Sequence, residues 1–208
     1  IIFDTRDNEP NPQTGVWEEL FFVSAPGFLG NKDYAFTKLV VTHRQYFPII
    51  KDQFSFAYRL SYQGNLFGDM PFYMLPFVFD SKITRDGLGG SKTMRGIMRN
   101  RVVGESMAFG TLELRYKFLR TVVFNQNLYI AISGFMDSGT VLKKYEFDTS
   151  GVPAGQIIYD TDESIHLSFG GGLHFALNEN FVVAIDYGIA ADKRDGTSGL
   201  YIGLNWLF

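Results

Sequence analysis

The segment Phe-Ser-Phe-Ala-Tyr-Arg-Leu-Ser-Tyr-Gln, residues 54–63, alternates strictly between large apolar side chains and small or polar ones. Successive side chains of a β-strand point to opposite faces of the sheet, so a period of two predicts a strand. One face of this strand would be bulky, and the other would carry serine, alanine, arginine and glutamine. The residues of the bulky face are Phe54, Phe56, Tyr58, Leu60 and Tyr62.

The same alternation recurs along the chain and predicts eight strands, preceded by a short β-like piece at residues 1–7. Glu18 and Glu19 make the facing of the first strand ambiguous, and Pro48 is expected to end the second. The predicted strands are residues 16–24, 34–47, 54–63, 105–118, 128–137, 165–177, 181–190 and 200–208. In the last strand, the residues expected on the bulky face are Leu200, Ile202, Leu204, Trp206 and Phe208.

The turns between these strands alternate in length, which is typical of an outer-membrane β-barrel. Short turns fall around residues 10–14, 50–53, 119–126 and 178–180, and long loops at 26–33, 65–104, 138–163 and 191–198. A soluble barrel or sandwich also alternates, but it shows long polar side chains to water. The small and charged faces of this chain instead suit a narrow lumen. We therefore predict an all-β, antiparallel transmembrane β-barrel of eight strands, closed because lipid tolerates no unpaired edge.

Composition narrows the classes of function. The chain has 208 residues, a formal net charge of -3, 21 phenylalanines, 11 tyrosines and no cysteine. The charge gives no electrostatic case for nucleic acid, and the lack of cysteine excludes disulfides and thiol chemistry. The sequence has no apolar run of about 18 residues that would predict a transmembrane helix. The first residues do not resemble a signal peptide, so we expect a mature chain, or a shortened one that has lost an upstream domain.

Residues 65–104 form the longest segment without strand alternation, and such loops are usually functional. Its centre, Leu-Gly-Gly-Ser-Lys-Thr-Met-Arg-Gly-Ile-Met-Arg at residues 88–99, is glycine-rich and basic. By alternation, Glu113 and Asp137 lie on neighbouring strands and face away from lipid. Two carboxylates in a narrow lumen need a cation, and Arg95 offers a planar fork for both. We therefore predict that the loop folds into the lumen and that Arg95 pairs with Glu113 and Asp137. The alternative is a solvated arginine.

Signals for catalysis or metal binding are weak. The histidines are His43, His166 and His174. The last two share a strand face but stand eight residues apart, over about 25 Å at ~3.3 Å per residue, so they cannot hold one metal ion together. A solvated loop is a simpler interpretation than a cation site for the acidic residues Asp148, Asp160, Asp162 and Glu163. The common hydrolase, phosphate-loop and zinc-protease motifs are missing. We expect no catalytic residue, no metal site and no cofactor.

The chain ends in Tyr-Ile-Gly-Leu-Asn-Trp-Leu-Phe, residues 201–208. Trp206 stands two residues before the terminal Phe208, and Gly203 stands five before it. With Tyr201, these positions resemble the β-signal by which bacterial outer-membrane barrels are handed to their assembly machinery. The alternative is an amphipathic final strand with a chance terminal phenylalanine. The resemblance implies that machinery as a partner and outer-membrane lipid as the surroundings.

Four further motifs, in family order, resemble the C-terminal barrel half of the outer membrane protein 85 superfamily, the BamA-like surface antigens. Residues 4–8 with Pro12 and Gly15 resemble its hairpin turn, and residues 112–114 and 135–141 resemble two of its strands. Residues 89–97 resemble the apex of its sixth extracellular loop. The matching loop positions are Gly89, Gly90, Arg95 and Gly96, with Ile97 in place of the usual aromatic residue.

The resemblance implies a non-enzymatic protein of the bacterial outer membrane, acting as a membrane anchor or in protein or lipid insertion. It would work with a periplasmic partner or an upstream domain, and a homodimer is a further option. Residues 1–14 would be a lead-in and periplasmic turn, and residues 15–208 the barrel, with 65–104 as its lumen-plugging loop. Two alternatives stay open. One is the C-terminal half of a sixteen-stranded insertase or translocase pore. The other is a small outer-membrane lipid-modifying enzyme with His166 and Asp162 close together.

Overall fold

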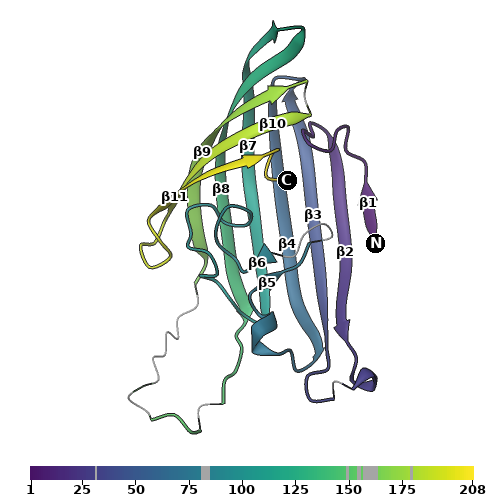
Figure 1. Ribbon diagram of the computed structural model, residues 1–208, viewed down its shortest axis with the longest axis vertical. Helices are drawn as coiled ribbons and strands as arrows, with labels where there is room; N and C mark the ends of the chain where they lie inside the picture. The colour runs from purple at the N-terminus through teal and green to yellow at the C-terminus, as the bar shows by residue number, and fades with distance from the viewer. Residues whose placement is uncertain (31, 81–84, 149, 154–155, 157–163, 179) are drawn as a thin grey trace.

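The computed structural model describes residues 1–30, 32–80, 85–148, 150–153, 156, 164–178 and 180–208. Nine strands form one antiparallel sheet, in which each strand pairs with its neighbours in the chain except that β4 is followed by β7 (Figure 1). These strands are β1 (Ile2–Asp4), β2 (Gly15–Ala25), β3 (Phe36–Ile50), β4 (Phe54–Gly68), β7 (Ser106–Val123), β8 (Gln126–Lys143), β9 (His166–Leu177), β10 (Phe181–Ala190) and β11 (Ser198–Leu204).

Smaller elements lie in the loops of the sheet. The loop between β2 and β3 contains the 3-10 turn η1 (Gly27–Leu29), and the loop between β4 and β7 contains η2 (Phe72–Met74). The latter loop also holds a two-stranded ribbon of β5 (Phe77–Val78) and β6 (Arg85–Asp86). Over the described part of the chain, no helix is long and apolar enough to span a membrane. The predicted all-β, antiparallel fold is confirmed.

The two faces of the sheet have opposite chemistry, as the alternation predicts. Large apolar side chains are exposed on the outer face, while charged and polar side chains are buried on the inner face. A soluble protein buries its apolar face instead, so this arrangement is that of a barrel wall in lipid. Outer residues include Leu60, Leu114, Ile132, Phe169, Tyr187 and Ile202, and inner residues include Arg59, Glu113, Arg115, Asp137, His174 and Asp186.

The sheet is an open, curved wall whose edges are β1 and β11. The two ends nevertheless approach each other. Asn8, in the turn before β2, donates from Nδ2 to Oδ1 of Asn180, in the turn before β10 (3.1 Å). Phe208 packs against Tyr46 and Ala57 on β3 and β4. We call the gap between β11 and the β1–β2 edge the seam; the described pairings do not close it with a backbone ladder.

Five predicted strand ends are wrong by three residues or more. β4 runs to Gly68 and not to residue 63, so the long loop begins at 69 and not at 65. β7 runs to Val123 and not to residue 118, so the short turn predicted at 119–126 is only residues 124–125, because β8 is long enough to pair with β7 up to that turn.

β3 continues past Pro48 to Ile50, because the proline lies at a register shift in the pairing with β4, where its missing N–H removes no regular ladder bond. β8 continues past Asp137 to Lys143, paired with β7 along this whole length. β11 ends at Leu204 and does not reach Phe208, since Asn205 adopts a left-handed φ of 65°.

The bend at Asn205 also overturns the predicted facing of the last residues. Trp206 and Phe208 are buried on the inner side of the sheet, at 4% and 6% exposure, and do not lie on the lipid face with Leu204. A single left-handed residue breaks the period-two pattern. The final aromatic side chains therefore become part of the interior.

The segment between β4 and β7 begins at residue 69 and folds back against the inner face of the sheet (Figure 1). Leu88 and Val102 form a β-bridge at its base. The segment and the inner face of β7 and β8 bury a shared apolar cluster. Its members are Val78, Leu88, Met94, Ile97, Val102, Met107, Phe109 and Val141. This cluster fixes the centre of the loop, residues 88–99, which we call the apex segment.

Candidate functional site

Glycine conformation shapes the apex segment into a tight double turn. Gly89, Gly90 and Gly96 have φ values of 117°, 86° and 93°, which other residues rarely adopt. The Gly90 N–H donates to the carbonyl oxygens of Met94 (3.0 Å) and Ile97 (2.9 Å). A side chain at Gly89 would collide with the carbonyl oxygen of Met98. The turn is therefore defined by backbone bonds and aims the residue between Met94 and Gly96 at the sheet.

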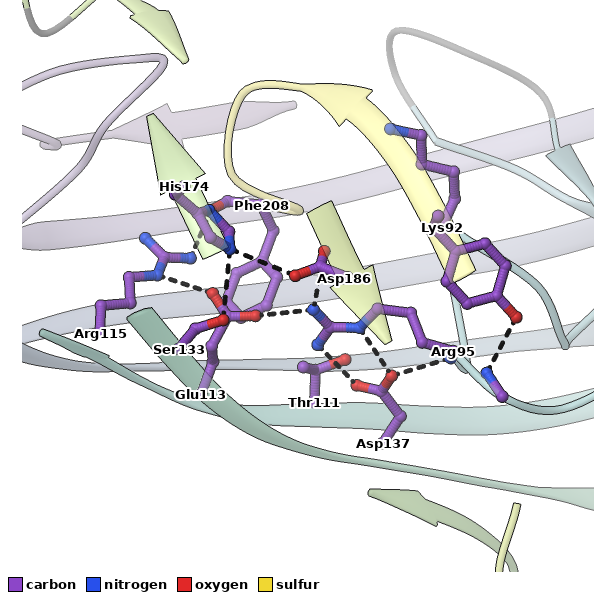
Figure 2. Close-up of polar contacts among 12 residues, drawn as sticks. Lys92, Arg95, Thr111, Glu113, Arg115, Ser133, Asp137, His174, Asp186 and Phe208 are labelled. Carbon is purple, nitrogen blue, oxygen red and sulfur yellow. Dashed lines mark hydrogen bonds and ion pairs between the residues drawn. The ribbon is translucent and has the colours of Figure 1, made fainter. Parts of the chain in front are cut away.

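That residue is Arg95, whose side chain is fully buried (Figure 2). Its backbone N–H donates to Oδ2 of Asp137 (2.9 Å), and its Nε and Nη2 donate to Oδ2 (3.0 Å) and Oδ1 (3.2 Å) of the same carboxylate. Nη1 donates to Oε2 of Glu113 (3.0 Å) and to Oδ2 of Asp186 (3.4 Å). We call these four residues the Arg95 cluster.

Three strands supply the carboxylates of the Arg95 cluster. Glu113 comes from the inner face of β7, Asp137 from β8 and Asp186 from β10. The guanidinium carbon of Arg95 also lies 3.3 Å from the centre of the Phe135 ring. Charge-assisted bidentate bonds and a cation–π contact are the strong forms of polar interaction inside a protein. The cluster thereby ties the apex segment to β7, β8 and β10.

A second arginine extends the polar network toward the C-terminus (Figure 2). Arg115 donates from Nε to Oε1 of Glu113 (2.8 Å) and from Nη2 to the Phe208 carbonyl oxygen (3.0 Å). Nε2 of His174 lies 3.2 Å from Oδ1 of Asp186, and its ring stacks on Trp206 at 3.8 Å between centroids. The terminal aromatic residues are thus joined to the same buried network.

The apex backbone lies directly against β10 and β11. A Cβ on Gly96 would stand 2.6 Å from the Ile189 nitrogen, and a Cβ on Gly188 would stand 2.6 Å from the Arg95 carbonyl carbon. The Gly96 N–H also donates to the hydroxyl of Tyr201 on β11 (2.9 Å). Two glycines facing each other allow this close approach, which places Arg95 within reach of Asp186.

The Arg95 cluster and Arg115 contain two guanidinium groups and three carboxylates, all away from solvent. Breaking one pair would strand a buried charge. The groups hold one another, and the Ser133 hydroxyl lies 3.3 Å from Nε2 of His174 at the edge of the network. The arrangement is suited to locking two segments together.

The structure brings Arg95, Glu113 and Asp137 together, and it places Ile97 in the apolar cluster beside them. Tyr201 contacts the apex directly, while Gly203 lies on β11 near the Lys92 side chain. Sequence reasoning did not join Asp186, Arg115 or His174 to this site. The alternation of their strands does put all three on the inner face. It could not have shown that β10 curves round to meet β7 and β8.

The other candidate residues lie elsewhere. His166 Nδ1 is 2.8 Å from Oδ2 of Asp195, whose Oδ1 is 3.2 Å from Arg101 Nε. This trio joins β9, the loop before β11 and the residues that follow the apex segment. His43 lies on the outer face of β3, 2.6 Å from Glu18. Of the acidic loop, Asp148 is exposed, and Asp160, Asp162 and Glu163 lie outside the described residues, as does the expected His166–Asp162 contact.

The N-terminal motif forms a compact turn. Arg6 pairs with Asp4 through two bonds of 3.0 Å, and Asp7 Oδ1 accepts the backbone N–H groups of Gln13 and Thr14. Gly15 closes the turn with a φ of 102°. The turn leads directly into β2 at the seam.

Comparison with protein families gives one match. The model of the Omp85 superfamily domain matches residues 1–208, which is the whole chain. A comparison with the curated proteins gives no match. The match includes every motif discussed above, from the hairpin turn at residues 4–15 to the terminal aromatic residues.

Proposed function

Because the chain belongs to the Omp85 superfamily, a family of outer-membrane β-barrel proteins, we propose that it promotes the insertion or assembly of other membrane components without being an enzyme. Its apex segment acts as an internal lock, and the seam acts as the working surface. The single observation that carries the lock is the fully buried Arg95, bonded to carboxylates from β7, β8 and β10.

A locked interior favours insertion of a client protein along the seam, and not transport of the client through the lumen. The apex segment and the terminal aromatic residues fill the inner side of the sheet, so a polypeptide would find little room there. The seam, in contrast, presents two strand edges without a described neighbour. Unpaired N–H and C=O groups at such edges template the pairing of another strand. On this proposal the partners are outer-membrane lipid, the barrel-assembly machinery and a periplasmic protein or domain.

The test is an assisted-folding assay. The purified protein is reconstituted in liposomes, an unfolded outer-membrane barrel is added, and folding of that client is followed by its heat-dependent gel mobility. We expect the client to fold faster than in liposomes that lack the protein. Equal rates in the two kinds of liposome would contradict the proposed insertion role.

The second candidate function is that of a sixteen-stranded pore, of which this chain would form one half; the open seam favours it. In lipid a sheet must leave no free edge, and two solutions fit the edges seen here. Either β11 pairs with the β1–β2 edge of the same chain, which closes an eight-stranded barrel, or further strands complete a sixteen-stranded pore. We propose the eight-stranded closure, supported by the Asn8–Asn180 hydrogen bond and the packing of Phe208 on β3 and β4 across the seam.

An outer-membrane lipid-modifying enzyme is the third candidate. The His166–Asp195 pair supports it, since such a pair orients an imidazole for general-base catalysis. The Arg101 contact gives Asp195 a structural role as well. Lipid-hydrolase activity that disappears in His166→Ala would replace the proposed insertion role with this one.

A further inference from the structure

A cavity of about 490 Å³ lies beside the seam, on the inner side of the sheet. It is bounded by the end of the chain after β11, by β3 and β4, by the turn before β2 and by the apex segment. Four of its lining residues are cationic and two are acidic. The cations are Arg6, Arg44, Arg59 and Lys92, and the acids are Glu9 and Asp80.

Two of the cations oppose each other directly. Arg44 of β3 and Arg59 of β4 are register partners in the antiparallel pair, and both line the cavity. Side chains at such positions have Cβ atoms about 4.5–5.5 Å apart, and like charges there are destabilising. Arg44 is bonded to Asp80 (2.9 Å). That carboxylate is bonded to Arg44, and the hydrogen bonds of Arg59 go to other groups.

Arg59 is 5% exposed, and the acceptors that the structure gives it are neutral. Its Nη2 donates to the carbonyl oxygens of Lys92 (3.2 Å) and Thr93 (3.4 Å) and to Oγ1 of Thr111 (3.2 Å). The contrast with Arg95, which has three carboxylates, is plain. Burying a cation is costly unless an anion compensates it.

Donor atoms around this cavity also go unused. Within the described part of the chain, the Nε atoms of both Arg44 and Arg59 are buried without an acceptor. Buried polar groups in native proteins nearly always have a partner, so each exception needs an explanation. Two opposed arginines that line one cavity are complementary to an anion with several oxygens.

We propose that this cavity binds a phosphate group, and that the phosphate belongs to the headgroup of a membrane lipid. Arginine recognises phosphate through paired, planar hydrogen bonds. An oxyanion between Arg44 and Arg59 would relieve their repulsion. The apolar side of the cavity is formed by Leu204, Trp206 and Leu207, and Leu204 is exposed at the seam. Acyl chains can therefore leave through the seam toward the bilayer.

The test measures binding to the whole chain in detergent micelles, by native mass spectrometry and by thermal unfolding. The probes are dioctanoyl phosphatidic acid, inorganic phosphate and uncharged dioctanoylglycerol. We expect phosphatidic acid to bind wild type at least tenfold more tightly than dioctanoylglycerol, and to raise its melting temperature. Arg44→Gln and Arg59→Gln should each weaken that binding at least tenfold. Arg194→Gln, an exposed arginine after β10, is the matched control and should bind like wild type.

Two variants keep the test decisive if one fails to fold. Arg44→Gln removes the partner of Asp80 together with the charge opposite Arg59, so its unliganded melting temperature is expected to fall. The proposal requires that phosphatidic acid no longer raises the melting temperature of this variant. A purely structural arginine would instead leave the rise caused by phosphatidic acid as large as in wild type. Inorganic phosphate binding as tightly as phosphatidic acid would keep the phosphate site and assign it to the free ion.

Three results would overturn the proposal. These are no binding of either phosphate probe to wild type, equal binding of dioctanoylglycerol, or binding within twofold of wild type in both arginine variants. The inference does not depend on the insertion role, because a phosphate site can exist in a barrel that inserts nothing. Client folding and phosphate binding are read out separately.

Discussion

Arg95 and Arg59 are both buried arginines on the inner side of the same wall, yet their surroundings differ. Arg95 meets three carboxylates, whereas Arg59 meets carbonyl and hydroxyl oxygens and two aromatic rings, Phe109 at 5.0 Å and Phe208 at 5.2 Å. The guanidinium of Arg95, bonded to three carboxylates, is part of the architecture, and that of Arg59, bonded to neutral oxygens, is the one that we propose contacts a ligand. Each of the two residues therefore calls for a different experiment.

Replacing Arg95 should release the apex segment. In Arg95→Ala, Asp137 loses the guanidinium that it binds and Glu113 is left with Arg115, while both carboxylates remain buried. Breaking such a set costs about 3–5 kcal/mol of folding free energy. We expect the folded band on a semi-native gel to convert to the unfolded band at a clearly lower temperature than in wild type.

The matched control for Arg95 is Arg99→Ala, an exposed arginine four residues further along the same segment. It should melt like wild type. If Arg95→Ala and Arg99→Ala melt together at the wild-type temperature, the apex segment is not a lock.

Gly96 offers a test that leaves all charges in place. Alanine there has to adopt a left-handed φ and place its Cβ 2.6 Å from the Ile189 nitrogen. Such strain costs on the order of 1–3 kcal/mol, so Gly96→Ala should loosen the apex from β10. Protection of the apex from protease in micelles is the measurement. Gly134→Ala, where nothing lies within 4 Å of the added Cβ, should be as protected as wild type.

At the scale of elements, the strands could be predicted well and their ends poorly. Period-two patterning places side chains on faces, which is why β10 is predicted with the same bounds as observed. Strand ends depend on whether a neighbour offers a ladder. β8 runs on through Ser138, Gly139 and Thr140, residues that resemble a turn in isolation, because β7 is long enough to pair with them.

The candidate site, too, could be predicted only in part from the sequence. Alternation puts Glu113 and Asp137 on one face of neighbouring strands, and the glycine-flanked Arg95 is an obvious cation for them. The contribution of Asp186 requires the curvature of the wall, which is a property of many strand pairings at once. The inward bend at Asn205 depends on one backbone dihedral angle, and hydrophobic periodicity carries no information on it.

The segment after β11 is expected to stabilise the folded wall through Trp206. Trp206 is 4% exposed and lies between His174 and Arg115, whose guanidinium carbon is 4.5 Å from the indole ring. Trp206→Ala would leave a cavity, and such truncations cost about 3–5 kcal/mol. We expect protein refolded in micelles to melt at a lower temperature, with partly exposed Leu207→Ala as the milder control.

This measurement separates two roles for the terminal residues. If they act only as an assembly signal read by other proteins, Trp206→Ala refolded in micelles should melt like wild type and fail only in cells. A lower melting temperature in micelles would show that the tryptophan also holds the wall together.

For the whole molecule, the feature to test is whether the seam closes within one chain. The chain has no cysteine, so engineered pairs report on it without background. Ile202 of β11 and Ile2 of β1 are both exposed on edge strands. With cysteine at Ile202 and, in turn, at Ile2, Phe3 and Phe22, closure into eight strands should give a disulfide within one chain. The measurement is the mobility of the oxidised protein on a non-reducing gel.

Single-cysteine variants are the controls, because they can form only disulfides between chains. Covalent dimers in the double variants, with no monomer carrying an internal disulfide, would contradict eight-stranded closure. They would favour a pore completed by a second copy.

The facing glycines, Gly96 and Gly188, have a consequence for the order in which the molecule is built. With backbone atoms this close, the apex segment cannot slide under β10 once the wall is complete. It has to settle on β7 and β8 first, where Asp137 and Glu113 receive Arg95, and β10 and β11 then close over it. The interior therefore folds together with the wall. In a chain whose apex segment docks too slowly, β10 and β11 would have no packed interior to cover.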